Sequence, residues 1–448
     1  MLERVTLSTA ARLYTRRIGN NHRTAFALRN SPSDVMGSST KAEPQRPVDL
    51  DGRVGEGGGQ LVRIATAISA ITGTPIRIHH VRANRARGGR GGGLKAQHVA
   101  CMRYLADATA AKLIDCDVGS SSVEFWPTLS PPHLLKRDVK IVSDSVGSIL
   151  LVFQALLPFL VMASSTDNTP ITLTIEGGTN VSFSPSFEYV DQVLLPALER
   201  FGISVERKLD CRGWSQGSRQ IGSIRFTINP LPFGQTLESP DWPSERGEIA
   251  QIDVSMVVPA AMHDDMKKAF LVELNTVFPE VNVEVLLVED SGHKARMYAL
   301  LVAHTSTGLR FGRDWLYDKT SKNKSPEALS IEMARGIVAG LERTVCRGGL
   351  VDEHLQDQLI IFQTLAAGMS VIPGSLETLN SSRERVEKTD EPFGDGTKHT
   401  TTARWVTSQV LPTEVKWIDR GRVCHGVGWK NEPSESGIVE KSTGRIVT

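Results

Sequence analysis

Two histidines stand where the sequence predicts helix starts, and an imidazole there could attack phosphorus as a nucleophile. His354 lies in Glu353-His-Leu-Gln-Asp-Gln358, and His399 lies in Lys398-His-Thr-Thr-Thr-Ala403. Neutral imidazole is nucleophilic near neutral pH, and the free N–H groups of a helix N-terminus attract phosphate. Because a lone histidine is more often structural, neither position identifies an enzyme by itself.

The sequence neighbours distinguish the two histidines. Asp357 follows His354 by one turn of the same predicted helix, and a nearby carboxylate raises the pKa of an imidazole. A protonated imidazole binds phosphate but cannot act as a nucleophile. His399 has no acidic residue within three positions, and three threonines that can cap a helix and orient a phosphate follow it. We therefore predict that His399 is the nucleophile.

Two glycine-rich segments could bind anions. Glu56-Gly-Gly-Gly-Gln60 stands directly before a predicted helix, but no Gly-Lys-Ser/Thr follows it, so it is not a Walker A loop. The loop 82–95 carries the cations Arg82, Arg85, Arg87, Arg90 and Lys95. Clustered arginines on a flexible backbone favour phosphate contacts. The alternatives are a structural turn for the first segment and a solvated linker for the second.

The predicted elements that must position these residues recur in one order. Helices are predicted at 61–71, 149–163, 187–201, 353–367 and 399–410, with a further one from about 94. Strands are predicted between them at 75–80, 169–175, 203–207, 370–372 and 414–418. This alternation predicts an α/β fold whose main domain is built from three repeated βαβα-type units.

Breaks in this pattern predict the domain boundaries. Residues 47–228 form the main catalytic domain with repeats one and two, and 337–448 add repeat three, with a polar insertion at 374–396 and a C-terminal tail. Residues 229–336 are predicted to be an inserted small α/β domain, with a helix at 262–275 and a strand at 281–288. Residues 1–46 are rich in arginine and poor in acids, so they are a disordered tail or an organelle transit peptide.

Composition excludes several classes of protein. The 448 residues carry a net charge of +1, so any nucleic-acid signal must come from local clusters. Five cysteines without a C-x-x-C pair argue against a disulfide framework and structural zinc. The longest apolar run, Ile149 to Ala163, is interrupted by Gln154 and Pro158 and is short for a bilayer span. We expect a buried helix there and no membrane partner.

Together and in order, the motifs resemble the RNA 3'-terminal phosphate cyclase family. They are Glu56–Gln60 with Arg63, Arg82-x-x-Arg85, Gln97-His98, Gly177-Gly-Thr-Asn180 followed by Pro185, His354–Gln358 and the helix start at His399. The resemblance spans most of residues 48–418. The fold of that family, repeated units with an inserted small domain, is similar to the one predicted above.

The resemblance implies a reaction in three steps. The histidine attacks the α-phosphorus of ATP, the resulting histidyl-AMP passes AMP to an RNA 3'-phosphate, and the 2'-OH then closes a 2',3'-cyclic phosphate and releases AMP. The implied ligands are ATP as substrate, Mg²⁺ or another divalent metal, and RNA with a 3'-phosphate end, with no obligate protein partner. The resemblance to the family implies a location in the nucleus. The arginine-rich N-terminus suggests the mitochondrion as an alternative.

The resemblance also implies a role for each matching residue. His399 is the nucleophile, and Glu56 holds the metal. The implied ATP contacts are Arg63, Gln154, Pro185, His354, Asp357 and Gln358, and the implied RNA contacts are Arg82, Arg85, Lys95 and Gln97. This sequence departs from the family pattern at 86–93, at Gly217–Gly222 and at 374–396, and the last departure lengthens the approach to His399.

Two alternative functions are compatible with these repeats. A ribosome-biogenesis relative has this fold without the nucleophilic histidine, which would make the chain a non-catalytic assembly factor. The enolpyruvyl-transferase class uses similar repeats and forms no histidyl-AMP. Only a cyclase would become covalently labelled by α-labelled ATP.

Overall fold

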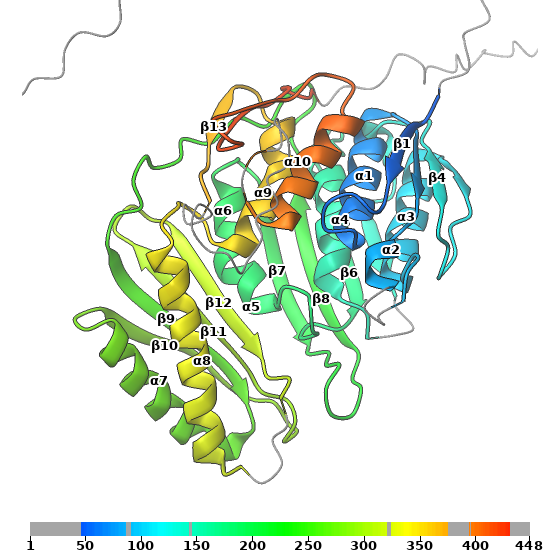
Figure 1. The fold of residues 1–448 in the computed structure, drawn as a ribbon. Coiled ribbons are helices and arrows are strands. Elements are labelled where there is room, and N and C mark those ends of the chain that lie inside the picture. Colours follow the sequence, from blue (N-terminus) through cyan, green and yellow to red (C-terminus); the bar gives the residue numbers. More distant parts are fainter. Residues whose placement is uncertain are drawn as a thin grey trace, which may run out of the picture. The chain divides into compact units, whose positions relative to one another are not determined.

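The computed structural model describes residues 46–86, 91–142, 146–319, 324–374, 394 and 396–430. The described residues all belong to one compact unit. Within this unit, the predicted α/β class is confirmed, with four small sheets and helices packed against them (Figure 1). The predictions for 1–46 and for most of 374–396 lie outside the described residues.

The first two repeats share one topology. The first sheet has the order β1-β2-β4-β3, with β1 (Val48–Asp51), β2 (Ile76–His79), β3 (Lys112–Ile114) and β4 (Val123–Trp126). The second has the order β5-β6-β8-β7, with β5 (Asp138–Ile141), β6 (Ile171–Gly177), β7 (Ser204–Cys211) and β8 (Gly222–Asn229). In each sheet the first two strands are parallel and the other pairs antiparallel.

The third repeat is smaller in the part of the chain that the structure describes. Its sheet has the order β13-β15-β14, with β13 (Met369–Val371), β14 (Lys416–Ile418) and β15 (Val423–His425), and both pairs are antiparallel. Its helices are α9 (Glu353–Leu365) and α10 (Lys398–Val410). Both begin within one residue of the predicted starts, because side-chain caps fix them at Asp352 and Thr397.

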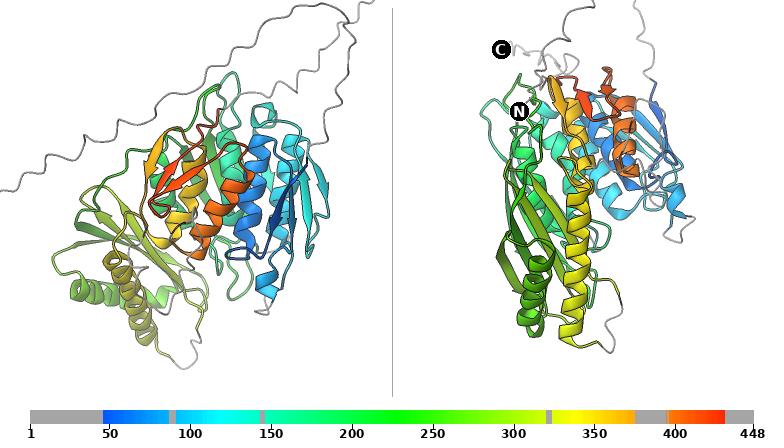
Figure 2. Two further views of the ribbon diagram at one scale, coloured as in Figure 1. Left: turned by 45° about the horizontal axis from the view of Figure 1, so that its top comes forward. Right: turned by 60° about the vertical axis from the view of Figure 1, so that its left-hand side comes forward.

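Helices from all three repeats meet in the core. These are α1 (Gly59–Thr72), α3 (Ala96–Thr109) and α4 (Ile149–Val161), with α9 and α10. Helix α1 packs against α3, α4 and α10, and α9 packs against α4 and α10 (Figures 1 and 2). This packing brings the glycine-rich loop before α1 to the starts of α9 and α10. The predicted buried helix is α4, and no helix of the described residues is long and apolar enough to cross a membrane.

Further helical segments complete the repeats. A single turn, α2 (Ala83–Ala86), follows β2. Between β6 and β7 the chain is helical from α5 (Phe187–Tyr189) through a π-helical stretch (Val190–Leu194) to α6 (Leu195–Glu199). The predicted helix at 187–201 is therefore present, with one widened turn in its middle.

The region between repeats two and three contains more structure than predicted. Its sheet has the order β10-β9-β11-β12, with β9 (Ile249–Val258), β10 (Asn282–Asp290), β11 (Tyr298–Thr305) and β12 (Arg310–Leu316). Helices α7 (His263–Val277) and α8 (Pro326–Cys346) pack on each other and on this sheet (Figures 1 and 2). Only α7 and β10 were predicted, so the expectation of one helix and one strand is wrong.

Burial explains which strands were missed. Edge strand β10 alternates between half-buried and exposed residues, which is the period-two signal of a strand. The inner strands β9 and β11 are buried at nearly every position from Ile252 to Val258 and from Tyr298 to Thr305, so their sequences show no alternation. Helix α8 runs across residue 336, where a domain boundary was predicted. The division into domains stays a prediction.

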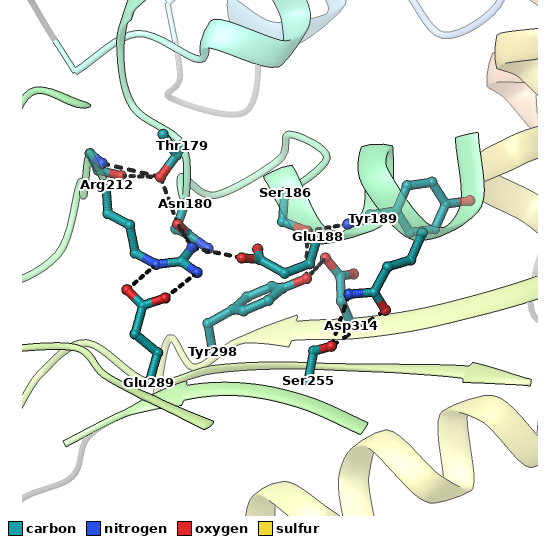
Figure 3. Close-up of polar contacts among 12 residues, drawn as sticks. Thr179, Asn180, Ser186, Glu188, Tyr189, Arg212, Ser255, Glu289, Tyr298 and Asp314 are labelled. Carbon is teal, nitrogen blue, oxygen red and sulfur yellow. Dashed lines mark hydrogen bonds and ion pairs between the residues drawn. The ribbon is translucent and has the colours of Figure 1, made fainter. Parts of the chain in front are cut away.

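A buried polar network joins this region to the second repeat (Figure 3). The Arg212 guanidinium contacts Glu188 at 2.7 Å and both carboxylate oxygens of Glu289 at 2.6 and 2.7 Å. Burial alone would lower the pKa of Arg212, but its contacts with Glu289 and Glu188 outweigh this and raise it. A guanidinium paired with two carboxylates thus anchors β10 to the second repeat.

Candidate active site

His399 contacts a residue of the first repeat. It is the second residue of α10, and its Nδ1 lies 2.8 Å from Oε1 of Gln60, the second residue of α1. The side chain of His399 is 47% exposed. The packing of α10 on α1 therefore holds one ring nitrogen and leaves the other face of the ring accessible.

Gln60 links His399 to Asp357. The Gln60 side-chain amide donates to Asp357 Oδ2, and Gln358 Nε2 donates to the same oxygen at 2.9 Å. Since the Gln60 nitrogen faces a carboxylate, its oxygen faces His399 and accepts a hydrogen bond from Nδ1–H. The lone pair of His399 is therefore on Nε2, the atom with nucleophilic character.

Glu56 completes the surroundings of the ring. Its Oε1 lies 4.0 Å from His399 Nε2, and its backbone N–H donates to Thr402 Oγ1 at 2.8 Å. Gly55 has φ of 64°, and a Cβ there would collide with Thr402, so only glycine allows this approach. No acidic residue lies within three positions of His399 along the chain, but the fold brings the Glu56 carboxylate close to its ring.

A pocket opens beside this chain of hydrogen bonds. Its polar lining comprises Gln60, Arg63, Gln154, Asp357 and Gln358, and its apolar lining includes Phe153, Leu157, Leu194 and Phe362. Four predicted ligand contacts therefore line one pocket. The buried Gln154 Nε2 has no hydrogen-bond partner among the described residues, so it can donate to a ligand.

Charged groups in the pocket are strongly desolvated. Burial raises the pKa of the Asp357 carboxyl above its usual value. Burial likewise lowers the pKa of Arg63, although the charge of Glu56 acts in the opposite direction. Electrostatic attraction is stronger where water is excluded, so Arg63 can stabilise an anionic ligand here.

His98 adds a hydrogen-bond donor that sequence reasoning left without a role. Its Nδ1 accepts from the Lys95 backbone N–H at 3.1 Å, so Nε2 carries the proton, and Nε2 is buried with no acceptor among the described residues. Burial, followed by the charges of Arg63, Arg82 and Lys95, lowers the pKa of His98 to about 3. A Cβ on Gly59 would lie 2.5 Å from His98 Nε2 and 3.1 Å from Arg63 Nη1, so both donors approach the start of α1. The pairing Gln97-His98 was the available signal.

The remaining predicted residues lie elsewhere. Pro185 and His354 are outside the lining of the pocket. His354 is 53% exposed, lies 3.7 Å from Glu353 and packs edge-on against the Tyr189 ring. Pro185 precedes α5, and its carbonyl accepts from Ser184 Oγ at 2.9 Å.

The predicted RNA contacts lie in the segment that runs from the end of β2 into the first turn of α3. Lys95 caps the start of α3, and Gln97 is half-buried one residue inside that helix. Arg82 Nη1 donates to the carbonyls of Gly91 and Gly93 at 3.2 Å. Arg85 belongs to α2, but its side chain lies outside what the structure describes.

Comparison with known proteins identifies the family. The model of the RNA 3'-terminal phosphate cyclase family matches residues 54–417. A protein of that name from Thermococcus kodakarensis is 33% identical over 323 residues, which cover 72% of this chain and 86% of the archaeal one. One from Drosophila melanogaster is 30% identical over 336 residues, which cover 74% of this chain and 86% of that protein. One from Pyrococcus furiosus is 29% identical over 395 residues, which cover 88% of this chain and 99% of that protein. The chain belongs to the RNA 3'-terminal phosphate cyclase family.

Proposed function

We propose that this protein converts an RNA 3'-phosphate to a 2',3'-cyclic phosphate at the expense of ATP, through a covalent histidyl-AMP on His399 Nε2. The observation that carries the proposal is the hydrogen-bonded chain from Asp357 through Gln60 to His399 Nδ1, beside a pocket with desolvated polar groups. The matching family and the names of its relatives support the substrate. They do not favour the alternative of a non-catalytic assembly factor.

The pocket suits a nucleotide. Its apolar wall can stack against a heteroaromatic ring, and the free Gln154 amide can bond the edge of that ring. Arg63 then faces the phosphates, and the charge that it stabilises grows as diphosphate leaves.

Glu56 suits one divalent ion bound together with phosphate. Among the described residues it is not grouped with two further potential protein ligands, and Mg²⁺ typically combines one or two carboxylates with phosphate oxygens and water. When bound, the ion would offset the negative charge of the triphosphate.

The hydrogen-bonded chain gives His399 the protonation state that the first step needs. The Nε2 lone pair attacks the α-phosphorus, a P–N bond forms and diphosphate leaves. The imidazole becomes cationic, and Gln60 Oε1 keeps its bond to Nδ1–H while Asp357 holds the Gln60 amide. The imidazole of adenylylated His399 is then a good leaving group from the AMP phosphorus.

The later steps activate the RNA end. A 3'-phosphate oxygen attacks the AMP phosphorus, and the P–N bond breaks to restore the Nε2 lone pair. The 2'-oxygen then attacks the activated 3'-phosphorus, loses its proton and expels AMP. We expect Arg82, Arg85, Lys95 and Gln97 to contact the RNA phosphate, and the His98 Nε2–H offers one further donor near the start of α1.

Two measurements test the proposal. Incubation with ATP labelled at the α-phosphate should give an acid-labile, hydroxylamine-resistant adduct on a peptide that contains His399. An RNA with a 3'-phosphate should then yield a 2',3'-cyclic end and AMP, whereas a 3'-hydroxyl RNA should not react. Failure to label, with ATP bound and the fold intact, would leave the assembly-factor reading.

The basic loop provides a second test. Arg82→Ala with Arg85→Ala should weaken RNA binding and reduce its salt dependence, because fewer phosphates are neutralised. Self-adenylylation without RNA should fall less than cyclisation. An unchanged salt slope in the double variant would remove the loop from the RNA site.

A further inference from the structure

Asp51, His79 and His80 form a cluster that the proposed reaction does not use. Their potential ligand atoms all lie within 4.8 Å of one another. His80 Nδ1 is 3.4 Å from Asp51 Oδ1, and His79 Nε2 is 3.9 Å from Asp51 Oδ2. Two ligands on one tetrahedral Zn²⁺, each about 2.1 Å away, stand roughly 3.4 Å apart. The His80–Asp51 pair already has this spacing. The His79–Asp51 and His79–His80 pairs lie within 4.8 Å and need a small side-chain rotation to reach it.

The backbone brings these side chains together at the carboxyl ends of two strands. Asp51 of β1 is the register partner of His79 in the parallel strand β2, so both side chains lie on the same face of the sheet. Strand alternation would send His80 to the opposite face. Its φ of 53° instead turns the chain, and the two imidazoles meet edge-on with centroids 4.9 Å apart.

Gly52 fixes the backbone that carries both histidines. Its N–H donates to the His79 carbonyl at 2.8 Å, and a Cβ at this position would come within 2.6 Å of the His80 carbonyl oxygen. The backbone is thus held in place, while the imidazoles are 38% and 49% exposed. A fixed backbone with adjustable imidazoles suits a site that closes on an ion.

Arg53 forms an ion pair with the Asp51 carboxylate. Its Nε and Nη2 donate to the two oxygens of Asp51 at 3.0 and 2.6 Å. Arg53 is largely exposed, and exposed ion pairs contribute only about 0–1 kcal/mol. A divalent ion can therefore displace the guanidinium at little cost.

We propose that Asp51, His79 and His80 form a binding site for a divalent transition-metal ion of the Zn²⁺ class. Two imidazole nitrogens with one carboxylate suit Zn²⁺, Co²⁺ or Ni²⁺, whereas Mg²⁺ prefers oxygen ligands. The site shares no residue with the ion position proposed at Glu56. Ion binding releases Arg53 from Asp51, directly before the loop that leads to Glu56.

Cobalt titration of the untagged, metal-free full chain tests this site. Bound Co²⁺ should show visible ligand-field absorption, and Zn²⁺ should displace it. His79→Gln with His80→Gln should weaken binding at least about tenfold, because even changes outside the ligand set cost 10–100-fold in metal affinity. Arg53→Ala should instead tighten binding, since the competing cation is removed.

Matched variants separate this site from other ligands. His425→Gln, at an exposed histidine of β15, should bind Co²⁺ as the unchanged protein does. Zn²⁺ should raise the melting temperature of the unchanged chain but not of the double variant, whose folding the same melts establish. His80→Gln alone replaces the double variant if that one fails to fold. Unchanged binding in the histidine variants, or thiolate charge-transfer bands from Cys211 or Cys346, would overturn the proposal.

Discussion

Helices α9 and α10 begin alike but surround their histidines differently. In each helix the second residue is a histidine, His354 or His399, and a capping side chain precedes it. Helix α9 is capped by Asp352 and begins with Glu353, whereas α10 is capped by Thr397 and has no acid in its first turn. His354 contacts Glu353 and the Tyr189 ring, while His399 is held by Gln60 of another repeat.

The difference shows that a helix start does not by itself make a histidine reactive. Both imidazoles lie where a helix N-terminus can stabilise phosphate. Only His399 has a partner that fixes the proton on Nδ1 and leaves Nε2 with its lone pair. Gln60, more than 300 positions away along the chain, therefore makes the surroundings of the two imidazoles different.

The sharpest test removes each imidazole in turn. His399→Ala should lower RNA cyclisation by at least about 10⁴-fold and abolish the AMP adduct, because no other group can form it. His354→Ala should keep an adduct at reduced yield, within about tenfold of the unchanged rate. Peptide mapping after α-labelled ATP distinguishes the two. An adduct on His354 that persists in the His399→Ala protein would reverse the assignment.

The next test removes the hydrogen-bond partner of each imidazole. Gln60→Met keeps the length of the side chain but cannot accept from Nδ1–H or donate to Asp357, so adenylylation should slow about 10²–10³-fold. Glu353→Gln, which alters the partner of His354, should change the rate of adenylylation less than about threefold. Single-turnover labelling at saturating ATP measures the step itself. Equal rates in the two variants would mean that the link through Gln60 has no catalytic role.

Removing the two capping side chains, Asp352 and Thr397, should lower the free energy of unfolding by different amounts. Asp352 accepts from the backbone of His354 and Leu355, from the Tyr189 hydroxyl at 2.7 Å and from the Gly312 N–H at 2.9 Å. Asp352→Ala strands these buried donors and should lower the free energy of unfolding by about 3 kcal/mol. Thr397→Ala loses one capping bond and should cost about 1 kcal/mol. Urea denaturation compares them, and similar losses would contradict the special role of Asp352.

A third histidine near a helix start, His98 of α3, should make the stability of the fold depend on pH. Its pKa of about 3 lies below the ordinary 6.5, so the folded state keeps it neutral while the unfolded state takes up a proton as pH falls. Stability should therefore decline on acidification, by about 2 kcal/mol from this group between pH 6.5 and pH 5.

His98→Asn should remove that part of the decline. Urea denaturation at several pH values measures it, with His425→Gln as the control at an exposed histidine. Parallel pH profiles for His98→Asn and the unchanged protein would show that His98 is not held neutral by burial.

Local signals in the sequence predicted much of this arrangement. The starts of α9 and α10 were predicted to within one residue, the apolar run marked α4, and β10 was predicted as a strand, since each signal spans only a few neighbouring residues. The order of the motifs was sufficient to predict the family.

Only the tertiary structure decided which atoms meet. Central strands β9 and β11 carry no alternation because both of their faces are buried. The hydrogen-bond partner of His399 comes from another repeat, and the burial of His98 depends on the packing of α3. The side chains of Asp51 and His80 meet because His80 has a positive φ. Hydrogen bonding and desolvation depend on distance in space, and helices of different repeats bring distant residues together at positions that local periodicity does not encode.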